Sequence, residues 1–173
     1  MARPALTIGA AVGALGLAFV APANAKSPPF PWKAGDSAPV IDGVKLGDTE
    51  AKARAVLGAP SGTAKMSDND VIDYANGLQI IANPGDGVSI IRLRSAAAGA
   101  IGGVKVGDDA AAVVARWGDP DTTAPGVALY NAGVWTVELR AQNGKVTDIL
   151  LGWNQTKWPN EQPGPNAKVY RPS

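Results

Sequence analysis

Three carboxylates lie close together in the segment Asp68-Asn69-Asp70-Val71-Ile72-Asp73. Hard cations such as Ca²⁺ prefer several oxygen ligands, so this segment is a candidate calcium site. The spacing lacks the central glycine and the terminal glutamate of an EF-hand loop. We therefore expect a solvated turn that leads into a strand, and no metal site.

Two glycine-bracketed segments and one pair of acids are the other places where the sequence could do chemistry. Gly43 to Gly47 and Gly103 to Gly107 each precede an expected helix, as phosphate-binding loops do. Neither segment ends in Gly-Lys-Ser/Thr, and an aspartate follows each where an anion would bind. Asp119 and Asp121 flank Pro120, which is typical of a turn rather than of the paired carboxylates of a glycoside hydrolase.

The composition excludes several classes of reaction. The chain has 173 residues, with 16 Lys+Arg against 15 Asp+Glu, and it contains neither cysteine nor histidine. Disulfides, thiolate or imidazole metal ligands and a Ser-His-Asp triad are thereby excluded. The balanced charge argues against nucleic-acid binding, which needs a basic patch. We expect no enzymatic activity, no cofactor and no nucleic-acid partner.

Aromatic residues are the stronger candidates for contacts with a partner. Trp32, Trp153 and Trp158 lie in or beside proline-rich segments, where tryptophan suits binding of a protein or a glycan. The alternative is that these tryptophans anchor the ends of the chain to the fold. Tyr74 and Tyr130 are expected to be half-buried beside turns. The candidate protein-binding residues are therefore Trp153, Trp158, Tyr74, Tyr130 and Trp32.

The first 25 residues have the pattern of a secretory signal peptide. Arg3 supplies the positive start, residues 6–20 form an uncharged apolar run, and Ala23-Asn24-Ala25 follows as a cleavage site of small residues. The run is shorter than the roughly 20 residues that a membrane-spanning helix needs. We expect the mature chain to be periplasmic or secreted, without a transmembrane segment.

One pattern occurs twice in the rest of the sequence. The residues from Ile41 to Asp48 resemble those from Ile101 to Asp108. Further matched pairs are Ala51 and Ala111, Ala55 and Ala115, Leu57 and Trp117, Gly58 and Gly118, Pro60 and Pro120, and Tyr74 and Tyr130. Low-complexity similarity would not place proline and tyrosine at corresponding points, so we interpret the pattern as a duplication.

Each copy is expected to begin with a short helix. The ranges are 49–57 and 109–117, with Asp48 and Asp108 as N-caps and a glycine after each helix. The expected strands are 71–74, 78–82 and 88–94 in the first copy and 127–131, 134–141 and 146–153 in the second, with a short extra strand near Thr63. Alternation at residues 135–140 predicts one buried face, whereas the first copy does not reveal its inner face.

The predicted fold class is α+β. It consists of two tandem modules, 41–97 and 98–153, each a short helix followed by a three- to four-stranded antiparallel meander. The modules would pack together or form one continuous sheet. A proline-rich linker at 26–40 and an irregular proline-rich tail at 154–173 flank them.

The pattern Gly-Val-x-x-Gly-Asp, a short helix and then Leu-Gly-x-Pro resembles the SmpA/OmlA family of outer-membrane assembly lipoproteins. It is also similar to the tandem modules of β-lactamase inhibitory protein. The residues that carry the resemblance are Gly43, Val44, Gly47, Asp48, Leu57, Gly58 and Pro60, with Gly103, Val104, Gly107, Asp108, Trp117, Gly118 and Pro120. The resemblance implies a helix-plus-sheet fold and a non-enzymatic binding role.

The sequence therefore predicts an exported, non-enzymatic protein-binding or scaffold protein of the bacterial cell envelope, whose partner is an envelope or secreted protein. Two alternatives stay open. One is an inhibitor of a secreted hydrolase, and the other is a module that binds cell wall or glycan through exposed tryptophans. The expected contact surface is a sheet face together with the loops 75–77, 83–87, 132–133 and 142–144.

Overall fold

A computed structural model describes residues 30–154. The predicted signal peptide, Trp158 and all but the first residue of the predicted tail lie outside the described residues. In chain order the elements are α1 (Glu50–Leu57), β1 (Gly62–Met66), β2 (Asn69–Asp73), β3 (Leu78–Asn83), β4 (Gly87–Leu93), the 3-10 helix η1 (Ala96–Ala98), α2 (Ala110–Trp117), β5 (Thr122–Ala124), β6 (Val127–Asn131), β7 (Trp135–Gln142) and β8 (Lys145–Trp153).

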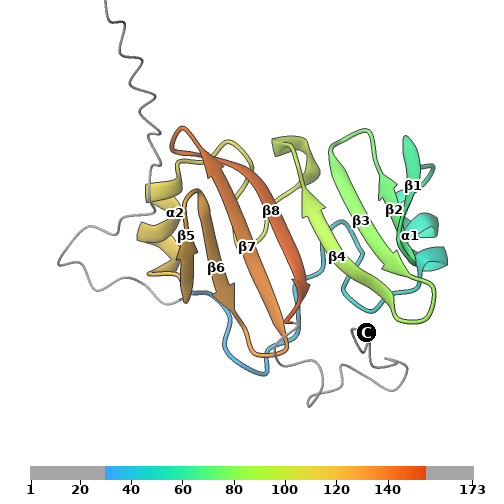
Figure 1. The fold of residues 1–173 in the computed structure, drawn as a ribbon, viewed down its shortest axis with the longest axis horizontal. Coiled ribbons are helices and arrows are strands. Elements are labelled where there is room, and N and C mark those ends of the chain that lie inside the picture. The colour runs from blue at the N-terminus through green and yellow to red at the C-terminus, as the bar shows by residue number, and fades with distance from the viewer. Residues whose placement is uncertain (1–29, 155–173) are drawn as a thin grey trace, which may run out of the picture.

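All eight strands belong to one antiparallel sheet, in the order β1-β2-β3-β4-β8-β7-β6-β5 (Figure 1). The two halves of the chain meet where β4 pairs with β8, from Ile90 opposite Gly152 to Leu93 opposite Ile149. The predicted fold class of two tandem modules, each a helix with its own meander, is therefore wrong. The physical reason is that β4 and β8 would each leave a row of unpaired backbone groups in a separate module, and pairing them satisfies both rows.

Both helices begin one residue later than predicted. Thr49 is the N-cap of α1 and accepts a hydrogen bond from the backbone N–H of Lys52, and Asp109 caps α2 in the same way. The predicted cap Asp48 instead accepts from the backbone N–H of Lys45 at 3.1 Å. Its carboxylate thus closes the turn before the helix and leaves the first helical N–H groups to the next residue. In the described part of the chain, no helix has the length and apolar character to cross a membrane.

One hydrophobic core runs through both halves on a single side of the sheet. Ala53 of α1 and Val113 and Trp117 of α2 pack into it, so both helices cover the same side. The largest fully buried side chains are Trp117, Trp135, Tyr130, Ile72, Leu78, Ile80, Ile91, Leu93, Ile101, Leu139, Ile149 and Leu151. A core shared in this way is a second reason why the halves are not separate modules.

Residues 30–36, which we term the arm, belong to the predicted proline-rich linker 26–40 and lie against the second half of the sheet. The ring of Phe30 stacks on that of Tyr130 at a centroid distance of 5.1 Å. Trp32 contacts Trp117 at 6.1 Å and Trp135 at 5.3 Å, both edge to face. The start of the described chain therefore closes the core of the half that is farther from it in sequence.

Candidate binding face

The side of the sheet opposite the helices carries no helix among the described residues, and we call it the open face. On β7, Trp135, Val137 and Leu139 point into the core, so Thr136, Glu138 and Arg140 point to the open face. Because directly paired residues share one side of a sheet, the register extends this row across the strands. The row that contains Glu138 runs through Asp73, Gln79, Arg92, Leu150, Glu138 and Leu129.

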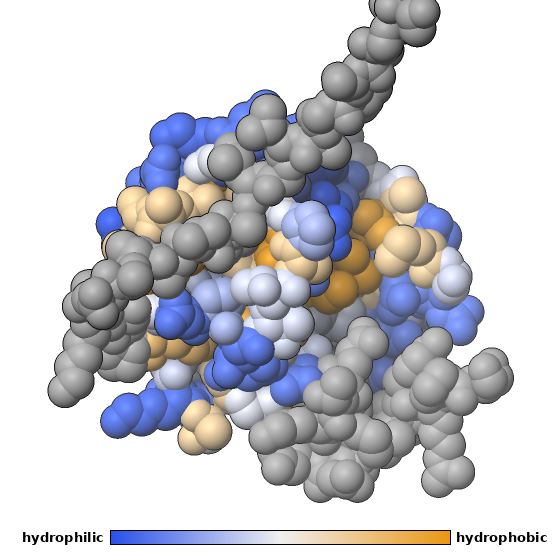
Figure 2. Space-filling view, turned by 60° about the vertical axis from the view of Figure 1, so that its left-hand side comes forward, coloured by the Kyte–Doolittle hydropathy of each residue, from blue (hydrophilic) through white to orange (hydrophobic). Residues whose placement is uncertain are grey.

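Aliphatic side chains from both halves contribute to the open face. Val71, Ile90, Val127, Leu129 and Leu150 are half-buried, and Ile81, which lies between Val71 and Ile90, is only 9% exposed. Gly152 lies in the row between Ile90 and Thr136 and has no side chain to fill its place. Figure 2 views the molecule from the side of α2 and β5 and shows hydrophobic and hydrophilic residues next to one another on that side. On the open face these aliphatic side chains lie beside polar ones such as Thr136 and Glu138, a mixture that is typical of protein interfaces.

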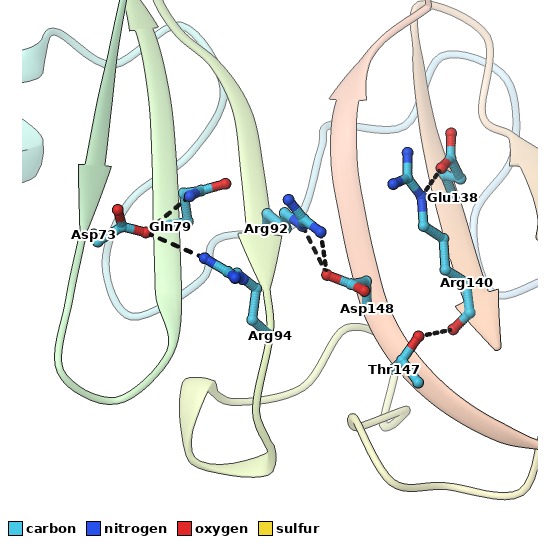
Figure 3. A network of polar contacts seen from close by, with 8 residues as sticks. All are labelled: Asp73, Gln79, Arg92, Arg94, Glu138, Arg140, Thr147 and Asp148. Atoms are coloured by element: carbon cyan, nitrogen blue, oxygen red, sulfur yellow. Dashed lines mark hydrogen bonds and ion pairs between the residues drawn. The ribbon is translucent and has the colours of Figure 1, made fainter. Parts of the chain in front are cut away.

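An ion pair crosses the boundary between the two halves on this face. Arg92 of β4 and Asp148 of β8 approach to 2.6 Å between Nη2 and Oδ1, and Arg92 Nε donates to the same oxygen at 2.7 Å. The two side chains are 26% and 17% exposed. Figure 3 shows them pointing toward one another above the paired strands. A double contact of this kind to one carboxylate is stronger than a single exposed pair.

Further charged residues of the open face are paired within one half (Figure 3). In the first half, Gln79 Nε2 donates to Asp73 Oδ1 at 2.8 Å, and Arg94 Nη1 lies 3.6 Å from the same oxygen. In the second half, Arg140 Nε and Glu138 Oε1 are 2.6 Å apart. Arg94 and Arg140 remain about half exposed, so each guanidinium can still donate to a partner.

The pKa of Arg140 is raised above its ordinary value. The main cause is the hydrogen bond to Glu138, with the Coulomb interaction with Glu138 next, while burial opposes the shift and Asp148 adds to it. A guanidinium is already charged throughout the accessible pH range. Arg140 therefore places a positive charge on this face, and the hydrogen bond to Glu138 holds the guanidinium in position.

The carboxylates of the segment 68–73, which were considered as calcium ligands, are not arranged around one point. Asp70 pairs with Lys65 at 2.8 Å, and Asp73 bonds to Gln79 and Arg94 instead. Within residues 30–154, no group of three or more acidic residues is placed so that it could hold a metal ion. Asp73 thus takes part in the hydrogen bonds of the open face, whereas Asp70 is paired with Lys65 of the edge strand β1.

The predicted contact loops divide between the two ends of the sheet. The loops 75–77 and 142–144 lie at one end, and 83–87 and 132–133 lie at the other, because β4 and β8 run antiparallel (Figure 1). The loop 83–87 and the start of α1 border an open hollow of about 540 Å³. In that hollow Asp86 has a buried carboxylate oxygen without a hydrogen-bond partner among the described residues.

The two predicted contact tyrosines lie in the core. Tyr130 is fully buried, and its hydroxyl donates to the carbonyl of Gly118 at 3.1 Å. Tyr74 is 7% exposed, and its buried hydroxyl has no hydrogen-bond partner among the described residues. Burial raises the pKa of both, that of Tyr130 to about 12, where Asp119 and Asp121 add to the effect.

The described candidate tryptophans also lie on the helix-bearing side. Trp32 is half-buried in the arm, and Trp153 is half-buried and packs against the core, opposite Trp135 on the neighbouring strand. Trp158 lies outside the described residues. Of the candidates, the structure thus brings Trp32 and Tyr130 together through Phe30, and it places Tyr74 in the other half.

Apart from Asp73, which was considered as a calcium ligand, the charged residues of the open face were not among the candidate site residues of the sequence. The signal that could have found them is the alternation of residues 135–140, in which every residue between the core positions is polar. The ion pair between Arg92 and Asp148 could not be found in this way, because no local pattern in the sequence indicates that β4 pairs with β8.

The chain matches no protein-family model, and no curated protein matches it. Among solved structures, it is similar to a cysteine-rich secretory protein from Staphylococcus aureus, with 9% identity and a TM-score of 0.53 over 82% of this chain and 57% of that one. A DUF4309 family protein from Bacillus subtilis is 15% identical, with a TM-score of 0.49 over 69% of this chain and 88% of that one.

At 9% identity the likeness to the staphylococcal protein shows a shared fold and nothing about activity. The match spans little more than half the length of that protein. Neither structure is of the SmpA/OmlA family or a β-lactamase inhibitory protein, so that resemblance stays a prediction. The comparisons therefore bear on the fold of the chain alone.

Proposed function

We propose that this chain is an exported, non-enzymatic protein-binding protein of the cell envelope that presents its open face to a partner protein. The segment 1–25, with the pattern of a secretory signal peptide, supports export. The open face supports binding, since it is a continuous surface to which both halves of the sheet contribute.

The observation that carries this proposal is the composition of the open face. Half-buried aliphatic side chains such as Leu150 and Leu129 lie in one row with Arg92 and Glu138. Arginine is enriched at protein interfaces because its guanidinium offers several donors on an apolar stem. A partner that covers this row would bury aliphatic surface and receive hydrogen bonds from arginines whose positions are already fixed by ion pairs.

Site-specific photo-crosslinking in intact cells tests the proposal. A photoreactive residue replaces Thr136 or Leu150, which are half-buried on the open face, or Ala111, which is exposed on α2. We expect a discrete crosslinked species from the two open-face positions and none from position 111. Equal crosslinking from all three positions, or none from the open face, would contradict the proposal.

A pair of arginine substitutions tests whether the crosslink depends on the open face, with one on that face and its control on α2. Thr136→Arg places a long side chain in the middle of the open face without removing a core contact, and Ala111→Arg does the same on the exposed surface of α2. With the photoreactive residue at position 150, Thr136→Arg is expected to abolish the crosslinked species. Ala111→Arg is expected to leave it unchanged, with the thermal unfolding temperature of both variants close to that of the parent.

A further inference from the structure

The arm packs against three aromatic residues of the second half, Trp117, Tyr130 and Trp135, and against Gly102. We call these four residues the arm site. A methyl group on Gly102 would lie 2.8 Å from the ring of Trp32, so the absence of a side chain there makes room for the indole. Four rings of this chain thus surround Phe30, at centroid distances between 5.1 and 6.5 Å.

Among the described residues, the ring contacts of the arm site are confined to the arm and the second half. In the duplicated sequence Leu57 occupies the place of Trp117, and it is half-buried. The first half thus has no tryptophan at the position against which the arm packs in the second half.

The arm is held by side chains rather than by a strand ladder. One hydrogen bond joins the arm to the sheet: Trp135 Nε1 donates to the backbone carbonyl of Asp36 at 2.8 Å. The other hydrogen bonds of the arm are local, between Lys33 and Asp36. Phe30 and Trp32 are half-buried, and residues 33–37 are exposed. A segment held in this way can leave without breaking the backbone pairing of any strand.

We propose that the arm site, made of Gly102, Trp117, Tyr130 and Trp135, is a peptide-binding site, occupied by the arm in this structure and by an extended segment of a partner protein when the arm is displaced. The arm defines the chemistry of that segment, which is an aromatic residue, a proline and a tryptophan in the order Phe30-Pro31-Trp32. Proline favours the extended conformation in advance, and aromatic walls bind such segments by stacking. The site is on the helix-bearing side and does not depend on binding at the open face.

A reversible staple between the arm and the sheet tests this inference. A Cβ atom added at Gly133 would lie 3.5 Å from Cβ of Ala34, a separation that a disulfide spans. The chain has no cysteine of its own, so the full-length variant with Ala34→Cys and Gly133→Cys would contain a single disulfide. Gly133 has a φ of +85°, and the strain of a side chain there is present in both redox states. The reduced variant is therefore the matched control for the oxidised one.

The probe is a fluorescent peptide with the sequence of residues 28–38, whose binding is followed by anisotropy. We expect the reduced variant to bind it and the oxidised variant to lose at least about tenfold in affinity, because the arm must leave before the peptide can enter. A peptide with alanine in place of Phe30 and Trp32 is expected not to bind. A second protein, full-length Phe30→Ala with Trp32→Ala, is expected to bind the original peptide more tightly than the wild type.

Several results would overturn the inference. Equal binding by the oxidised and reduced forms would show that the peptide binds elsewhere, and no binding by the reduced form would show that the arm is a fixed part of the core. A disulfide that forms between two chains rather than within one would indicate exchange of arms between copies instead. If the double alanine variant fails to fold by circular dichroism, the comparison of redox states decides alone.

Discussion

Arg92 and Asp148 form a 2.6 Å ion pair across the line where the two halves of the sheet meet. The two residues are far apart in sequence and lie on strands that pair edge to edge. Both side chains are largely withdrawn from water, so their attraction is less screened than that of an exposed pair. The ion pair therefore stabilises the junction of β4 and β8 and also contributes charged groups to the open face.

Loss of this ion pair is expected to destabilise the fold measurably. Arg92→Leu keeps an apolar stem but leaves Asp148, which is 17% exposed, without its guanidinium partner. We expect a loss of about 1–2 kcal/mol in the free energy of unfolding, between the values for exposed and for buried pairs. Urea unfolding followed by circular dichroism measures it. Arg94→Leu is the control, because its pair with Asp73 is longer and more exposed, and it should cost less than about 0.5 kcal/mol. Equal losses for the two variants would contradict this ranking.

The two core tyrosines are expected to respond differently to removal of their hydroxyl groups. Tyr130→Phe removes a buried donor and leaves the carbonyl of Gly118 without it, at a cost of about 1 kcal/mol. Tyr74→Phe removes a buried hydroxyl that has no hydrogen-bond partner among the described residues, so stability should be unchanged or slightly increased. Thermal unfolding of both variants under one condition provides the comparison. A loss for Tyr74→Phe as large as that for Tyr130→Phe would show that its hydroxyl is bonded in solution.

Stability at alkaline pH is expected to depend on Tyr130. Its pKa is raised from 10.0 to about 12 in the folded chain, first by burial and then by Asp119 and Asp121. The folded state therefore holds the phenolic proton more tightly than the unfolded state does. The resulting stabilisation is fully present below pH 10 and is lost as the pH rises through 12. Urea midpoints between pH 9 and pH 12 should fall more steeply for the wild type than for Tyr130→Phe, and parallel curves would refute this role.

Local features of the fold could be predicted from the sequence. Helices at 49–57 and 109–117 were expected, and α1 and α2 lie within those ranges. The glycine that follows each helix marks its end as predicted, whereas the N-caps are Thr49 and Asp109, one residue later than predicted. The strand at 127–131 agrees with β6, and the alternation at 135–140 identified the core side of β7. Such features depend on contacts between near neighbours in sequence.

The inner face of the first half could not be predicted, and the structure shows why. Adjacent isoleucines occur in β3 and in β4, so alternation gives no unique face for either strand. Ile80 and Ile91 point into the core, whereas Ile81 and Ile90 point to the open face. An irregularity in the pairing of β3 with β4 after Ile81 changes the register as well.

The assembly of the sheet and the residues of the open face depend on long-range pairings. Nothing near Arg92 in the sequence indicates that Asp148 is its partner, since that follows from the joining of β4 and β8. The position of Trp32 on Trp117 and Trp135 is equally non-local. The sequence shows that the arm contains aromatic residues, but it does not show which side of the sheet these residues cover.

The closure of the second half by the arm constrains the order in which the chain can fold. Residues 30–36 are synthesised before everything they touch, yet their partner Trp135 follows about a hundred positions later, and the bond between Asp36 and Trp135 spans 99 residues. While the chain leaves a ribosome or a translocation pore, the rings of the arm stay exposed to water until β7 has emerged. The arm can therefore dock only late in folding, and a chain truncated before β7 would lack Trp135, against which the arm packs.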